Sequence, residues 1–128
     1  MKEIVYASQA PSAIGTYNQA VKNNGFIYTS GQLGIDPQTG YIVEGGIGDE
    51  TLRALQNINI ILEEAGANKS SILKLTVFIT DLEGFNYVNN SFKIFFQGVD
   101  YPARSTVEVS ALPMDAKVEI ECVAFLGE

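Results

Sequence analysis

The segment Ile72–Ile79, with the sequence ILKLTVFI, restricts the possible folds of this 128-residue chain more than any other segment. It is almost continuously apolar and rich in β-branched side chains, a composition typical of a strand that is covered on both faces. We therefore expect a sheet with this strand in its interior and other parts of the structure packed against each face.

Two amphipathic helices are expected, one on either side of this strand in the sequence. The first begins near Asp49 and ends at Gly66, and between them apolar residues recur at steps of three and four. Acidic residues at its start suit the positive end of the helix dipole, and glycine commonly ends a helix. The second helix is expected from about Gly84 to Phe96.

Five further strands complete the expected order of elements. The pair Asn24-Gly25 predicts a tight hairpin turn, whereas Gly31 and Gly34 indicate a bulge or a close backbone approach. The expected strands are Glu3–Tyr6, Asn18–Lys22, Phe26–Ser30, Ser105–Ser110 and Lys117–Phe125. Three strands, a helix, a strand, a helix and two strands predict one α+β domain over residues 1–128. It would have a six-stranded mixed sheet with both helices packed on one face.

The residue types that are missing narrow the possible chemistry. The chain has no histidine, which excludes a Ser-His-Asp triad, a Cys-His dyad and any metal site that needs histidine. Cys122 is the only cysteine, so neither an intrachain disulfide nor a thiolate metal cluster can form. Catalysis would depend on carboxylates, hydroxyls, Arg, Lys or backbone amides, and we expect no metal.

The charge balance argues against a nucleic-acid partner. Eight Lys and Arg residues against fifteen Asp and Glu give a net charge of -7, and the basic residues are scattered. Charged residues make up only 18% of the chain, which suggests that a partner covers some of the surface. The sequence contains neither a signal-peptide pattern nor an apolar run of membrane-spanning length, so we expect a cytoplasmic protein without membrane contact.

Three side chains on two segments are candidates for chemistry on their residue type and position. Arg104 enters an apolar strand, where its guanidinium could clamp a carboxylate or serve as an ordinary ion-pair partner. Glu119 and Glu121 alternate with apolar residues along the last strand. They form either a solvated acidic face or, if one carboxylate faces a cleft, a general acid/base with a raised pKa.

Several motifs together resemble the RidA family, also called YjgF/YER057c/UK114. They are AIGTYNQAV (Ala13–Val21), YTSGQLG (Tyr28–Gly34), TVFITDLEGF (Thr76–Phe85), YPARSTVEVSALP (Tyr101–Pro113) and VEIE (Val118–Glu121). The resemblance implies a chorismate-mutase-like fold and a homotrimer with clefts between subunits. It also implies cofactor-free hydrolysis of small 2-imino acids, 2-iminobutanoate and 2-iminopropanoate, to 2-oxo acids and ammonia, which protects pyridoxal-phosphate enzymes from imine and 2-aminoacrylate damage.

The same resemblance assigns roles to individual positions. Arg104 matches the residue that binds the substrate carboxylate, and Glu119 matches the acidic residue that handles the attacking water. Cleft positions are matched by Tyr17, Ser30, Gly31, Asn89 and Thr106, the last at a place where cysteine is common.

Two other functions remain open at this point. The same cleft could serve a non-catalytic regulatory protein that binds 2-oxo acids. An endoribonuclease or translation inhibitor, a function also raised for relatives, is disfavoured by the net charge of -7 and the scattered basic residues.

Overall fold

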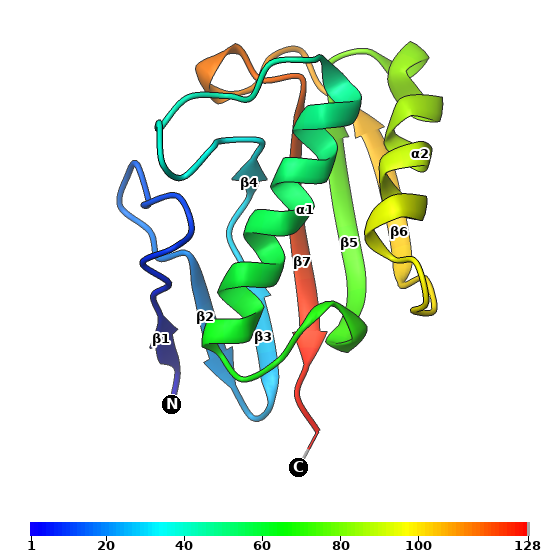
Figure 1. Ribbon diagram of the computed structural model, residues 1–128. Coiled ribbons are helices and arrows are strands. Elements are labelled where there is room, and N and C mark those ends of the chain that lie inside the picture. The colour runs from blue at the N-terminus through cyan, green and yellow to red at the C-terminus, as the bar shows by residue number, and fades with distance from the viewer. Residues whose placement is uncertain (128) are drawn as a thin grey trace.

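The computed structural model describes residues 1–127, in which two helices lie against one face of a seven-stranded sheet (Figure 1). Helix α1 spans Ile47–Glu64 and helix α2 spans Phe85–Phe95. The strands are β1 (Glu3–Val5), β2 (Ala20–Asn23), β3 (Phe26–Thr29), β4 (Gln32–Leu33), β5 (Ile72–Ile79), β6 (Ala103–Glu108) and β7 (Val118–Phe125). Short 3₁₀ helices lie at η1 (Lys69–Ser71), η2 (Leu82–Gly84) and η3 (Pro113–Asp115). The predicted α+β fold with both helices on one face is confirmed.

The sheet is mixed, with the strand order β1-β2-β3-β7-β5-β6 and with β4 paired to β7. All neighbours are antiparallel except β5 and β6, which run parallel. Helix α2 connects these two strands, because a parallel pair needs a crossover connection. The strand expected in the interior, β5, indeed has a neighbour on each side.

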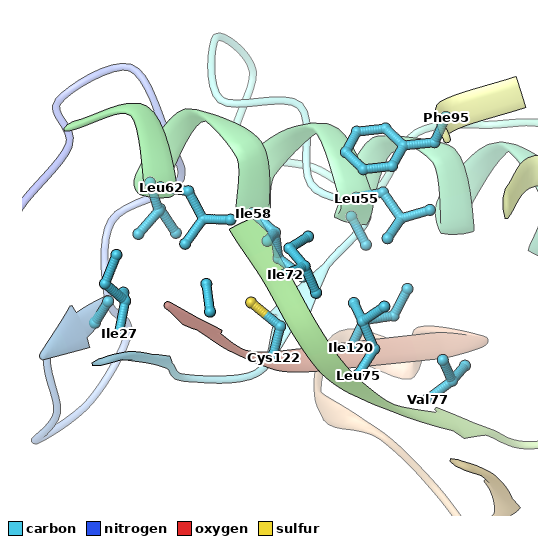
Figure 2. Packing of buried hydrophobic residues seen from close by; sticks show 14 of the residues in the cluster. Ile27, Leu55, Ile58, Leu62, Ile72, Leu75, Val77, Phe95, Ile120 and Cys122 are labelled. Carbon is cyan, nitrogen blue, oxygen red and sulfur yellow. The ribbon is translucent and has the colours of Figure 1, made fainter. Parts of the chain in front are cut away.

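The main core lies between the sheet and the helices (Figure 2). Alternation along β5 and β7 directs Leu75, Val77 and Ile120 toward the helices, where each is fully buried. Helix α1 contributes Ile58 and Leu62 to the same layer, and both are fully buried as well. The apolar faces of the helices and of the strands therefore pack together in one buried layer.

The opposite face of the sheet carries half-exposed aromatic and aliphatic side chains. Tyr28 is 48% exposed, Val107 is 42% exposed and Phe125 is 37% exposed. The register places them on one face, opposite the helices. We expected both faces of β5 to be covered. Within residues 1–127 this holds only for the helix face, because both helices lie on that side.

Several elements differ from the expected ones, and β2 begins at Ala20 and β6 at Ala103, two residues after and two residues before the expected starts. Strand β4 is an additional, seventh strand, and Gly34 follows it at a place where a Cβ atom would lie 2.6 Å from the carbonyl oxygen of Glu50. The expected close backbone approach thus occurs there. Helix α1 begins at Ile47, two residues before Asp49, and the carbonyl of Gly48 accepts a hydrogen bond from the Ser91 hydroxyl (2.6 Å). Neither helix in this part of the chain is long and apolar enough to cross a bilayer.

Candidate active site

Arg104 lies on β6 and faces helix α2. The parallel register pairs Arg104 with Leu75, so its side chain points to the helix-covered face of the sheet. Its Nη2 donates a hydrogen bond to Oδ1 of Asn89 on α2 (2.7 Å). The guanidinium carbon lies 4.6 Å from the ring centroid of Phe92 and 5.3 Å from that of Phe85. Two aromatic rings and one amide therefore fix the orientation of the guanidinium.

The Arg104 guanidinium has the charge and the free hydrogen-bond donors to bind an anion. Burial lowers its pKa from the ordinary value, but an arginine side chain remains protonated near neutral pH. Asn89 accepts a hydrogen bond from only one nitrogen of the Arg104 guanidinium, which has five N–H donors. The other donors can form paired hydrogen bonds to a carboxylate. A cavity of about 420 Å³ adjoins it, with Lys93 and Tyr101 also in its lining. This arrangement can hold a small carboxylic acid.

Thr106 lies two residues further along β6, on the same face as Arg104. The register pairs it with Val77, whose side chain is fully buried. Its Oγ1 is buried and has no hydrogen-bond partner within residues 1–127. A buried hydroxyl without a partner is energetically unfavourable, so a polar ligand group at this place would satisfy it.

Glu119 lies on the opposite face of the sheet. On β7 it pairs with Phe78 of β5 and with Leu33 of β4, and it lines a pocket of about 40 Å³ together with Tyr17 and Gly31. A Cβ atom at Gly31 would lie 2.5 Å from Oε2 of Glu119. Only glycine at this position therefore leaves the carboxylate in its place.

The environment of Glu119 favours its protonated form. Burial raises the pKa of this carboxyl group, and the negative charge of Glu121 raises it further. A carboxyl group whose pKa lies closer to neutral pH can both accept and donate a proton under physiological conditions.

The remaining predicted residues lie near Glu119. The hydroxyl of Tyr17 accepts a hydrogen bond from the backbone amide of Ile14 (3.2 Å), and the Tyr17 ring is 44% exposed. Ser30 precedes Gly31 and donates its hydroxyl proton to the carbonyl of Asn18 (2.6 Å). The chain therefore presents Tyr17 to the pocket, while the Ser30 hydroxyl is bound to the backbone beside it.

The predicted site residues thus form two groups on opposite faces of the sheet. We call Arg104, Asn89 and Phe92, which line the cavity, together with Phe85 beside the guanidinium and Thr106 further along β6, the Arg104 half-site. We call Glu119, Gly31, Tyr17 and Pro113 the Glu119 half-site. The backbone layer of the sheet separates them, so a small ligand cannot contact Arg104 and Glu119 of the same chain in this arrangement.

Sequence reasoning missed the two aromatic rings beside Arg104 and the proline beside Glu119. The spacing of Phe85 and Phe92 fits the apolar face of a helix, which by itself indicates core residues, and Phe92 is indeed part of the core. The signal that could have identified them is an aromatic pair on the helix that leads directly into the strand of the arginine. Among residues 1–127, no His, Cys, Asp and Glu side chains are grouped in threes so as to hold a metal ion.

Comparisons with known proteins agree on one family. The family model described as Endoribonuclease L-PSP matches residues 7–126. The 2-iminobutanoate/2-iminopropanoate deaminase of Rattus norvegicus is 42% identical, over 99% of this chain and 92% of that protein. A solved structure of a conserved Rid family protein from Yersinia pestis has a TM-score of 0.94 at 47% identity, covering 98% of this chain and 100% of that one. The structure of E. coli TdcF with bound serine has a TM-score of 0.93 at 41% identity, covering 98% and 99%.

Proposed function

The chain belongs to the Endoribonuclease L-PSP family, also known as the RidA/YjgF family, and on this premise we propose that it hydrolyses small 2-imino acids to 2-oxo acids and ammonia. The proposed substrates are 2-iminobutanoate and 2-iminopropanoate, whose removal would protect pyridoxal-phosphate enzymes. The observation that carries the proposal is the guanidinium of Arg104, fixed by Asn89 and two aromatic rings at a cavity. A relative named for this activity at 42% identity supports it.

Arg104 would act first, by binding the substrate carboxylate. Two parallel charge-assisted hydrogen bonds fix both the position and the plane of a carboxylate. Because the imine carbon is bonded directly to the carboxyl carbon, this contact also fixes the reacting atom. The buried hydroxyl of Thr106, which has no partner in the described chain, would bond to the substrate or to the water.

Glu119 would handle the water that attacks the imine carbon. With the imine nitrogen protonated, Glu119 as a carboxylate accepts a proton from water while the water oxygen bonds to the imine carbon and the C=N electron pair moves to nitrogen, which gives a neutral carbinolamine. Glu119 then donates this proton to the amino nitrogen. As the carbon–nitrogen bond breaks, the carboxylate takes up the proton of the carbinolamine hydroxyl, and ammonia and the 2-oxo acid leave. Its raised pKa suits both steps. Imines also hydrolyse without a catalyst, so a rate enhancement of roughly 10²–10⁴ from acid/base catalysis is adequate.

We further propose that a homotrimer completes the site. Arg104 and Glu119 lie on opposite faces of one sheet, so one substrate can contact both only if the two residues come from different chains. The half-exposed Tyr28, Val107 and Phe125 on the face of Glu119 offer an apolar surface for a neighbouring subunit. In this arrangement, the Arg104 half-site of one subunit would face the Glu119 half-site of the next.

A trapping assay tests the activity. A dehydratase produces 2-iminobutanoate from threonine, semicarbazide competes for the imine, and the amounts of semicarbazone and 2-oxobutanoate are followed with and without the protein. The wild-type protein should decrease semicarbazone formation, whereas Arg104→Ala should not, because the substrate carboxylate loses its anchor.

Arg53→Ala is the matched control, since Arg53 is the only other arginine and contacts Asn57 on the same helix. It should behave like the wild type. Equal semicarbazone formation with and without the wild-type protein would exclude catalysis on this class of substrates. The cleft would then be a binding site for small amino or oxo acids, which the serine bound to TdcF supports as the second candidate.

A further inference from the structure

The cavity beside Arg104 has a charge opposite to that of the whole chain. Its lining contains two cationic side chains, Arg104 and Lys93, and no acidic one among the residues that the structure describes. The chain as a whole has fifteen acidic and eight basic residues. A local positive lining concentrates anions. One arginine is sufficient for one carboxylate, so Lys93 is available to a second anionic group on the ligand.

The position of Lys93 on α2 defines where that second group would lie. Asn86, Asn89, Asn90 and Lys93 all line the cavity, and their spacing places them on one face of the helix. Asn89 holds the guanidinium, and Lys93 follows it by four residues, a rise of about 6 Å along the helix. In an extended five-carbon diacid, four bonds of about 1.5 Å separate the carboxyl carbons, which spans about 5 Å. A second carboxylate held beside the first therefore lies about one helical turn away along α2, where the long, flexible side chain of Lys93 can meet it.

We propose that, in addition to the small substrates 2-iminobutanoate and 2-iminopropanoate, this chain takes 2-imino acids with a second carboxylate at the far end of a four- or five-carbon chain. Arg104 binds the carboxylate next to the imine, and Lys93 binds the distal one. The amides of Asn86 and Asn90 supply further N–H donors along the same helix face. The volume of about 420 Å³ is within the range of roughly 300–1,000 Å³ typical of sites for larger ligands. This inference rests on the proposed function, because Arg104 serves both.

The test compares two stable 2-oxo acids of similar length by calorimetric titration of the full-length protein. The first, 2-oxoglutarate, has the distal carboxylate, whereas 2-oxohexanoate ends in a methyl group. Lys93→Gln should weaken binding of 2-oxoglutarate by about twofold to fivefold, the range of an ion pair with an exposed lysine. The same variant should change binding of 2-oxohexanoate less than twofold. Lys2→Gln removes the same charge outside the cavity and should change neither.

The outcomes separate this inference from the proposed function. If Lys93→Gln affects both acids equally, or neither, Lys93 does not bind a distal carboxylate and the inference is wrong. In that case Arg104→Ala should still weaken the binding of both acids, because both have a carboxylate next to the oxo group. If neither acid binds to the wild-type protein, Arg104 is not a carboxylate anchor, and the inference and the proposed anchor are both overturned.

Discussion

At the scale of single residues, the chemistry of Glu119 depends on two neighbours. Gly31 faces its carboxylate so closely that any side chain at position 31 would displace it. Glu121 lies two residues further along β7, on the same face, and its negative charge adds to the effect of burial on the pKa of Glu119. The position of the group is therefore set by a glycine, and its proton affinity by burial and by a second acid.

This arrangement predicts how the activity depends on pH. Glu119 must be ionised to accept a proton from water, so the rate falls as the pH decreases through its pKa. Because that pKa is raised, the fall occurs at a higher pH than for an ordinary glutamate. Glu121→Gln removes a negative charge, lowers the pKa of Glu119 and shifts the acid limb of kcat/KM to lower pH. The profile is measured in the trapping assay, with the spontaneous rate subtracted at each pH.

Glu3→Gln is the matched control, because Glu3 lies on β1 at the other edge of the sheet from β6. The acid limb of the kcat/KM profile of Glu3→Gln should coincide with that of the wild type. An acid limb that stays in place in Glu121→Gln would mean that Glu119 is not the group whose ionisation limits the rate.

At the scale of elements, the long periodic segments could be predicted from the sequence. The alternation along β7 correctly separated Glu119 from the buried Val118 and Ile120, because a strand directs successive side chains to opposite faces. Strand β4 could not be predicted, since two residues show no periodicity. Helix α1 begins two residues before Asp49, and its first turn makes a tertiary hydrogen bond from Ser91 to Gly48. A local sequence pattern carries no information about such tertiary contacts.

Helix α1 provides a test of the element packing. Ile58 is fully buried between α1 and the sheet, so Ile58→Ala should lower the free energy of unfolding by about 2–5 kcal/mol through lost apolar burial and a cavity. Ile94 lies on α2 with 62% of its surface exposed, and Ile94→Ala should change the free energy by about 0.5 kcal/mol or less. Denaturant titrations at one chain concentration measure both, because assembly makes stability concentration-dependent. Similar losses in both variants would contradict the packing described here.

At the scale of the whole molecule, the sequence named the candidate site residues, which stay a prediction, but could not predict that the chain places them in two half-sites on opposite faces of the sheet. The motif around Arg104 does not reveal which face of β6 the arginine occupies. That face follows from the parallel register with β5, which is a property of the sheet and not of the segment. The low charged fraction of 18% suggested a covered surface, and the half-exposed Tyr28 and Phe125 lie on the face that we propose for the neighbouring subunit. The homotrimer itself stays a prediction.

The shared site predicts that two inactive variants restore activity when their subunits are mixed. Arg104→Ala and Glu119→Gln should each be inactive as pure proteins. In equally mixed trimers, each cleft takes Arg104 from one subunit and Glu119 from its neighbour. About one quarter of the clefts therefore contain both intact residues, and about one quarter of the wild-type activity returns. The variants are unfolded together, refolded together and measured in the trapping assay.

The alternative, in which one chain supplies both residues, gives a different result. Every chain in the mixture then lacks one of the two residues, so no cleft is intact at any mixing ratio. Mass spectrometry of the intact assemblies establishes whether the subunits have mixed and whether three chains are present. Mixed trimers without restored activity would exclude the shared site, and a single-chain mass would exclude the trimer. Restored activity that is greatest at equal proportions of the two variants would place Arg104 and Glu119 of different subunits in one cleft.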